Sequence, residues 1–338
     1  MSVLDKKLKC YTMVWDFSVV ALNRRQVMEI TFGMIYRQMV GLFTLLLIGY
    51  WMNRSRKLPK ETEDVLAQLS TKLFLPALLF FTFLEECTLE SLMKNSRWIL
   101  YGTLFTVSSI LIAVLLARPM ARGASYIEKV YRYALVFPNA GGFAMPIIMI
   151  LWGNEVFFQY QLFMLPVNIF CYSWGVAQLI PNGHQNLRER LENFCNPVFI
   201  ATILGMVFGV TGIKEYLPEF LYNSIQNLSN CYTPVTLILT GFVIGDYHVK
   251  EILENGMSYV FAALRLLIIP GVFLFVLRLL HAPDILCVIV CLVYACPCGM
   301  NTVVYPAAYG EDTCPGASLV LITSTLSVFS IPFLYTMI

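Results

Sequence analysis

Apolar runs of about twenty residues, separated by short polar links, occupy most of the chain. A helix rises 1.5 Å per residue, so a run of this length spans the hydrocarbon core of a bilayer. The pattern predicts ten spans, at 34–53, 66–85, 98–117, 131–152, 156–179, 196–212, 224–245, 258–279, 284–309 and 314–338. The links leave no room for a soluble domain, so the sequence predicts an all-α polytopic membrane protein.

Two proline landmarks recur along the chain at nearly the same interval. Pro76 in LSTKLFLPALLFF is followed 158 residues later by Pro234 in LSNCYTPVTLILT, and Pro138 in FPNAGGFAMP is followed 159 residues later by Pro297 in CPCGMNTVVYP. This agreement indicates an internal duplication. Each unit holds an odd number of spans, so the copy enters the membrane in the opposite direction, which predicts two inverted five-helix repeats. The chain then divides into an N-terminal extension, a first repeat, a central loop and a second repeat, at residues 1–33, 34–179, 180–195 and 196–338.

The run around FPNAGGFAMP holds two prolines and two glycines, which interrupt or weaken a helix. Unwound backbone at membrane depth is tolerated only where it is buried in protein or lines a cavity. Matching breaks in two inverted halves are typical of a transport site. We therefore predict that the fourth and ninth helices are broken and cross. The prolines expected to cause breaks are Pro76, Pro138, Pro146, Pro234, Pro297 and Pro306.

The side chains at these breaks suit a small anionic ligand. The N-terminal end of a half-helix carries partial positive charge and free N–H donors, which favour a carboxylate. Asn139 and Asn301 offer donors and acceptors, Thr302 adds a hydroxyl, and Gly141 and Gly142 let the backbone approach a ligand. These residues are predicted to bind substrate. The alternative for Asn139 is that it only caps a half-helix.

The composition agrees with a membrane protein. The 338 residues are 58% hydrophobic and only 13% charged, with a mean hydropathy of +0.69, whereas a soluble domain carries roughly a quarter charged residues. The basic residues lie in short links rather than in a stripe, so the net charge of +2 gives no indication of nucleic-acid binding. The ten cysteines show no spacing typical of a disulfide framework. We expect no cofactor and no resident metal.

The charges give an orientation and two further candidates. Lys and Arg concentrate in the links after spans one, three, five and seven, which predicts that these links are cytoplasmic and both termini are outside, although the basic N-terminal extension argues against this. Lys72 either snorkels to the headgroups or lies near an anion route. Arg265 either pairs structurally or attracts anions. No Asp or Glu falls in the middle of spans four, five, nine or ten, which disfavours a proton exchanger with paired carboxylates.

The string PNAGGFAMPIIMILWG resembles the crossover of the auxin efflux carrier family. LPALLF, NPVFIATILGMVFG, RLLIIP and YPAAYGEDTCPGASLVLITSTLSVFSIP match further family features in the same order, so the resemblance covers about residues 35–338. The bacterial malate-permease-like branch is the closer in length, because it also lacks a long central loop. The resemblance implies a ten-helix transporter of small organic anions such as malate, other carboxylates or auxin-like acids, with a possible homodimer through scaffold helices.

The same resemblance places Asn139 and Asn301 at the crossover and Leu75 and Asn168 in the pocket wall. The Cys296-Pro297-Cys298 sequence departs from the small residues expected there, which leaves the substrate preference open.

We predict a secondary carrier of small organic anions that works by alternating access in the plasma membrane and is not an enzyme. Its expected partners are the anion and the lipid bilayer. One alternative is a sodium-coupled carrier of the bile-acid transporter type. Another is a soft-metal transporter, because thiolates select copper(I) or zinc; its candidate ligands would be Cys287, Cys291, Cys296 and Cys298. An intramembrane enzyme is disfavoured because the three histidines lie in predicted links and no span carries an Asp pair.

Overall fold

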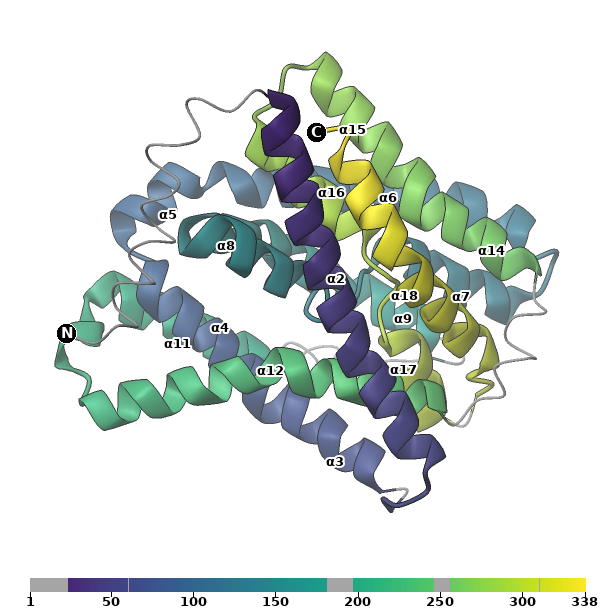
Figure 1. Cartoon of the computed structure of the whole chain (residues 1–338), viewed down its shortest axis with the longest axis horizontal. Helices are drawn as coiled ribbons and strands as arrows, with labels where there is room; N and C mark the ends of the chain where they lie inside the picture. The colour runs from purple at the N-terminus through teal and green to yellow at the C-terminus, as the bar shows by residue number, and fades with distance from the viewer. Residues whose placement is uncertain (1–23, 60, 181–196, 246–255, 310) are drawn as a thin grey trace.

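The computed structural model describes residues 24–59, 61–180, 197–245, 256–309 and 311–338 (Figure 1). These residues form helices joined by short links, and no strand occurs among them. Residues 1–23 of the N-terminal extension, and all of the central loop except Ile180, lie outside the described residues.

The helices follow the chain in a simple order. They are α2 (Arg24–Arg54), α3 (Thr62–Leu69), η2 (Ser70–Phe74), α4 (Leu75–Glu86), α5 (Leu89–Asn95), α6 (Arg97–Met120), α7 (Ser125–Val136), α8 (Ala144–Phe170), η3 (Cys171–Gly175), α9 (Val176–Leu179), α11 (Pro197–Thr211), η5 (Ile213–Tyr216), α12 (Glu219–Gly245), α14 (Gly256–Ala263), η6 (Leu264–Ile268), α15 (Ile269–Leu279), α16 (Asp284–Ala295), α17 (Asn301–Ala308) and α18 (Cys314–Tyr335). Among the described residues, six helical stretches are long and apolar enough to cross a membrane: Thr62–Glu86, Arg97–Met120, Leu151–Leu179, Glu219–Gly245, Gly256–Leu279 and Cys314–Tyr335.

Four of the prolines expected to break helices do not do so. Pro76 is the second residue of α4, directly after the π-helical turn η2, and the helix runs on from η2 into α4. Pro146 is the third residue of α8, in a first turn where its missing N–H would have had no partner. Pro234 and Pro306 lie inside α12 and α17, which continue beyond them. The prediction was wrong at these positions. Pro76 follows a π-helical turn and Pro146 lies in a first turn, while interior prolines such as Pro234 and Pro306 are tolerated in membrane helices because surrounding groups satisfy the freed backbone groups.

Two close helix pairs form one part of the molecule, where α12 packs on α2 and α11 packs on α4. Glycines set these approaches. A Cβ added at Gly241 would lie 1.8 Å from the carbonyl oxygen of Leu46, and one at Gly209 would lie 2.4 Å from that of Phe83. Small residues at an interface are how helices gain contact in lipid, where burying apolar surface brings no advantage over lipid tails. In Figure 1, α2 crosses the face of the molecule and meets α12 near its lower end.

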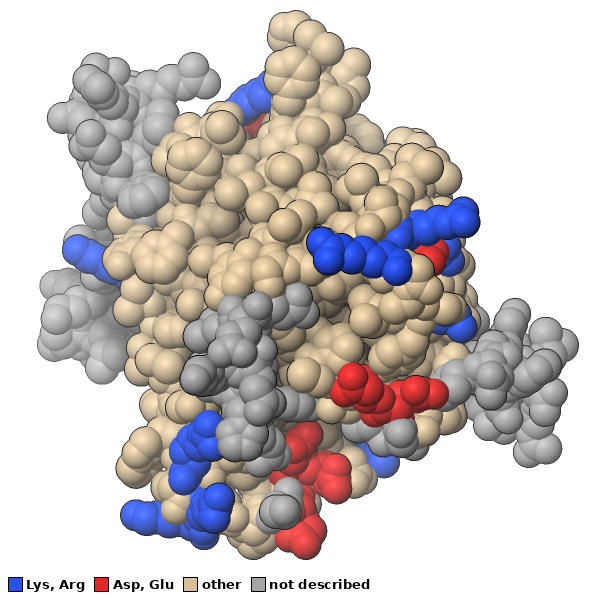
Figure 2. All heavy atoms as spheres, turned by 90° about the vertical axis from the view of Figure 1, so that its right-hand side faces the viewer, with Lys and Arg blue, Asp and Glu red and all other residues tan. Residues whose placement is uncertain are grey.

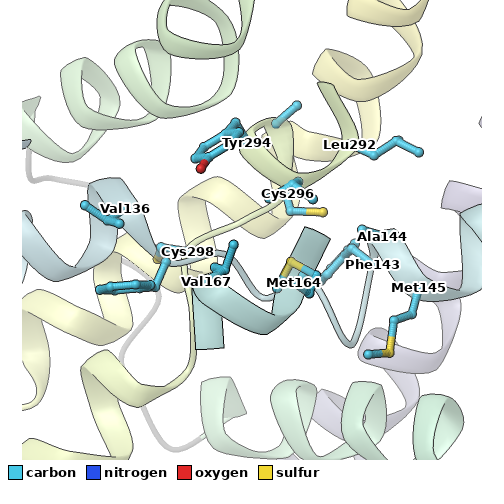
Figure 3. Packing of buried hydrophobic residues seen from close by; sticks show 14 of the residues in the cluster. Val136, Phe143, Ala144, Met145, Met164, Val167, Leu292, Tyr294, Cys296 and Cys298 are labelled. Atoms are coloured by element: carbon cyan, nitrogen blue, oxygen red, sulfur yellow. The ribbon is translucent and has the colours of Figure 1, made fainter. Parts of the chain in front are cut away.

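The remaining helices form a second group, in which α6 packs on α7 and α8 and the η6–α15 segment packs on α16 and α18. The two groups meet where α2 contacts α8 and α18 and where α4 contacts α8. Buried side chains fill the space around the links from α7 to α8 and from α16 to α17 (Figure 3).

The outer surface suits lipid. Large apolar side chains such as Leu115 and Phe275 are more than 70% exposed. Figure 2 shows Lys, Arg, Asp and Glu gathered in a few places, with wide uncharged areas between them. A water-soluble protein rarely exposes apolar surface on this scale. The surface and the apolar helices together define an integral, multi-pass membrane protein.

Candidate functional site

Two helices are interrupted where the sequence predicts broken helices four and nine. α7 ends at Val136 and α8 begins at Ala144, while α16 ends at Ala295 and α17 begins at Asn301. Each interruption therefore presents the C-terminal end of one half-helix and the N-terminal end of another. The first end carries partial negative charge and the second partial positive charge.

The two interruptions cross and are joined by backbone hydrogen bonds. The N–H of Asn139 donates to the carbonyl of Pro297 at 2.8 Å, and the N–H of Gly299 donates to the carbonyl of Phe137 at 3.0 Å. The pair forms an antiparallel bridge centred on Pro138. On this strand the bonds use the carbonyl of Phe137 and the N–H of Asn139, the groups on either side of Pro138, so the N–H that proline lacks is not needed. We call this element the crossing, residues 137–143 and 296–300.

Side chains tie the crossing to the surrounding helices. The amide nitrogen of Asn301 donates to the hydroxyl of Tyr133 at 2.8 Å, and that hydroxyl lies 3.1 Å from the sulfur of Cys171. The hydroxyl of Thr302 donates to the carbonyl of Gly299 at 2.9 Å and is fully buried. Asn301 is thus held by a residue of the other interrupted helix.

A cavity of about 430 Å³ lies against the crossing, within the size range of small-molecule sites. It extends from the first turn of α3, along η2 and α4, to the crossing and α12. Its walls are Glu63, Asp64, Ala67, Gln68, Ser70, Thr71, Leu75, Leu79, Tyr133, Pro138, Asn139, Ala140, Gly141, Met145, Tyr160, Met164, Asn168, Cys171, Tyr172, Val198, Tyr232, Thr236, Leu239, Thr240, Val243, Gly299, Met300, Asn301 and Val304.

The cavity collects most of the residues that the sequence singled out. Asn139, Gly141, Asn301, Asn168 and Leu75 all line it. They come from four different stretches of the chain, so the fold brings together positions that the sequence could only name separately.

Four other candidates do not line the cavity. Gly142 is buried beside the Asn139 side chain, and Thr302 is turned toward the backbone. The exposed Lys72 ammonium donates to the amide oxygen of Gln68 at 3.1 Å, and Gln68 itself lines the cavity, so both alternatives for Lys72 stay open. Arg265 is completely buried and donates to backbone carbonyls, which agrees with structural pairing.

Several buried polar groups in the cavity wall have no protein partner. The Nδ2 of Asn139 and the hydroxyls of Ser70 and Tyr160 are buried and form no hydrogen bond with any described residue. Buried polar groups are nearly always hydrogen-bonded, so these groups are available to a ligand or to water. Three such groups on one cavity wall indicate a binding site.

The charge of the wall is unusual for an anion site. Among the described residues that line it there is no Lys, Arg or His, and the acidic pair Glu63 and Asp64 lies at the α3 end. An anion would therefore have to be held by dipoles and neutral donors. Four tyrosines contribute to the wall, namely Tyr133, Tyr160, Tyr172 and Tyr232. These tyrosines were not among the predicted site residues. A tyrosine in an apolar span needs a hydrogen-bond partner for its hydroxyl, and this need could have marked them as candidates.

Residues 34–335 match the profile of a family described as membrane transport protein, which is the auxin efflux carrier family. The chain belongs to this family, so the resemblance seen in the sequence is confirmed at the level of the family, and the malate-permease-like branch stays a prediction. The match includes both interruptions and the whole cavity. No individual curated protein matches the chain. The family is one of membrane transporters and not of enzymes, so the protein is a membrane transporter with a small-molecule substrate.

Proposed function

We propose that the protein is a secondary carrier of small organic anions, such as malate or other carboxylates, which works by alternating access. The observation that carries this proposal is the crossing: the N-terminal ends of α8 and α17 both begin at the wall of the cavity. Paired half-helix ends of this kind bind the anionic group of a substrate in other secondary transporters.

The wall chemistry supports a carboxylate with a carbon body. The free amide of Asn139 and the backbone at Gly141 can donate to the carboxylate. Leu75, Met145 and Met164 offer an apolar surface for the remainder of the molecule. Dipoles and neutral donors bind an anion without the strong attraction of a direct ion pair, which suits a carrier that must also release it.

The packing supports ten spans in two inverted repeats. In that arrangement the first and sixth spans (α2 and α11) correspond, as do the second and seventh (α3–α4 and α12). The contact of α2 with α12 then has its counterpart in the contact of α11 with α4, and both are present. The contact of α6 with α7 likewise has its counterpart in that of α15 with α16.

The side on which the cavity opens supports an orientation. Its acidic end is the start of α3, next to the link that carries Arg54, Arg56 and Lys57. The excess of Lys and Arg in this and equivalent links assigns it to the cytoplasm. We propose that the conformation described is open to the cytoplasm of a cell whose plasma membrane holds the carrier.

The test is uptake by the purified protein in liposomes. Radiolabelled malate, malonate, succinate and indole-3-acetate would be followed with and without a sodium gradient, a pH gradient and an imposed potential. Asn139→Ala should lower saturable uptake at least about tenfold, since one charge-assisted hydrogen bond is worth about 1.5–3 kcal/mol. Asn223→Ala, at an exposed asparagine outside the cavity, is the matched control and should transport normally.

The outcomes separate the proposal from its rivals. Saturable uptake of an acid without sodium supports it, and a strict sodium requirement would instead favour a carrier of the bile-acid type. Normal uptake by Asn139→Ala would remove Asn139 from the site. Movement of none of the four acids in any gradient would refute the organic-anion proposal.

A further inference from the structure

Arg265 occupies a position that the proposed transport site does not explain. Its side chain starts from the π-helical turn η6 and is 0% exposed. Its Nη1 donates to the carbonyl of Leu135, and its Nε donates to the carbonyl of Cys296 at 3.3 Å. Leu135 lies in the last turn of α7, and Cys296 directly follows α16. One guanidinium therefore binds the C-terminal ends of both interrupted helices.

This charge has no acidic partner in the described part of the chain, where none of the ion pairs includes Arg265. Its Nη2 is also buried without a hydrogen-bond partner. An uncompensated buried charge is strongly destabilising. What compensates it here is the pair of carbonyl ends, because the C-terminal end of a helix carries about half a negative charge. Two such ends together offset about one positive charge.

The partial charges of the helix ends also determine the electrostatic field in the cavity. The crossing brings together two N-terminal ends of about +0.5 each and two C-terminal ends of about −0.5 each, so their fields cancel at a distance. Neutralising the C-terminal ends leaves a net charge of about +1 at the crossing. We infer that Arg265 is a positioning residue that makes the crossing electropositive without lining the cavity and without touching the substrate.

This inference rests on the proposed function and explains how an anion can be selected by a wall with no cationic side chain. Arg265 does not line the cavity. A cation in the wall would pair directly with the carboxylate, whereas Arg265 acts through the electrostatic field and leaves the carboxylate free to dissociate. Because it binds both broken helices, its charge stays with the crossing.

The experiment compares Arg265→Gln with Arg265→Lys. Glutamine still donates to a carbonyl but is neutral, while lysine keeps the charge and also donates. A purely structural role predicts similar effects from both variants. The probes are two pairs of equal size, indole-3-acetate with indole-3-acetamide and malonate with malonamide. The measurement is the affinity of the purified protein for each member, and the readout is the ratio of the acid's affinity to the amide's.

We expect Arg265→Gln to lower this ratio at least about tenfold, the effect of one charge roughly 10 Å away at an effective dielectric constant of about 20. Arg265→Lys should keep the ratio within about threefold of wild type, and amide affinity should change little in either variant. An unchanged ratio in Arg265→Gln would overturn the inference. If the glutamine variant does not fold, a loss of the ratio in Arg265→Lys would overturn it instead. Failure of the wild-type protein to bind either acid would be a failure of the proposed function.

Discussion

Replacing Gly141 with alanine tests whether the crossing moves against α12. A Cβ at this position would lie 2.4 Å from the hydroxyl oxygen of Tyr232 and 3.0 Å from its Cε1, whereas ordinary contacts begin at 3.4 Å. About 1 Å of displacement is therefore required. Overpacking of this kind costs about 1–3 kcal/mol. If the crossing moves away from α12 in the opposite conformation, the overpacking destabilises the described conformation only. The population of the described conformation relative to the opposite one would then fall about 5–150-fold.

The assay is modification of Cys171, a cysteine that lines the cavity. Protein in sealed vesicles is treated, without substrate, with a membrane-impermeant thiol reagent on the side assigned to the cytoplasm, so that the described conformation is the one that presents Cys171 to the reagent. Mass spectrometry reads the rate at this residue separately from the others. Gly141→Ala should slow the modification. The double variant Gly141→Ala/Tyr232→Phe should recover much of the rate, because the closest clashing atom is gone. Gly271→Ala, where an added Cβ would meet nothing within 4 Å, is the control and should leave the rate unchanged.

Two results would refute this reasoning. An unchanged modification rate in Gly141→Ala would mean that the crossing does not part from α12, or that the site relaxes freely. A slow rate that Tyr232→Phe does not improve would mean that the contact with Tyr232 is not the cause. Thermal unfolding of each variant separates both results from a general loss of stability.

Two further predictions concern stability. Gly241→Ala should lower the Tm in detergent by several degrees, because the added Cβ would lie 1.8 Å from the backbone oxygen of Leu46. Gly41→Ala, whose added Cβ would meet nothing within 4 Å, is the control and should not lower the Tm. Equal Tm values for the two variants would contradict the packing of α12 on α2. Lys214→Met removes an ion pair with Glu85 at the membrane surface, which is partly exposed and is worth at most about 1 kcal/mol after solvent screening. The hydrogen bond to Glu85 raises the pKa of Lys214 above the ordinary 10.5, so the pair stabilises the fold below that pH and this stabilisation is lost as the pH rises through the raised pKa. The Tm difference between wild type and Lys214→Met should be steady near neutral pH and close only under strongly alkaline conditions; a difference that grew with pH would contradict this assignment.

The apolar pattern predicted where helices lie but not where they begin. The fourth predicted span starts at residue 131, whereas α7 starts at Ser125, and the first starts at 34, whereas α2 starts at Arg24. Hydropathy marks the stretch within hydrocarbon, and a helix continues into the headgroup region with polar residues. The gap between the spans ending at 152 and beginning at 156 contains Gly153, whose φ of 74° turns the chain inside α8.

The sequence predicted those site residues whose own type and immediate neighbours indicate a binding role. Asn139 and Asn301 stand out because a polar side chain beside a helix breaker in an apolar run has few structural explanations. Tyr133 did not stand out, and Arg265 stood out only as a charge in an apolar span with two alternative roles, because the partners of both residues are far away in the chain. Asn301 is 168 residues from Tyr133, and Leu135 is 130 residues from Arg265. Proline predicted helix breaks less well than expected, since α12 and α17 continue past Pro234 and Pro306.

The two hydrogen bonds of the crossing have a mechanical consequence. Together with the guanidinium of Arg265 they fasten one interrupted helix to the other. Opening a passage between the two interruptions would require all of these hydrogen bonds to break at once. If the carrier works by alternating access as proposed, the contacts that change are therefore at the rim of this pair, where Gly141 lies against Tyr232.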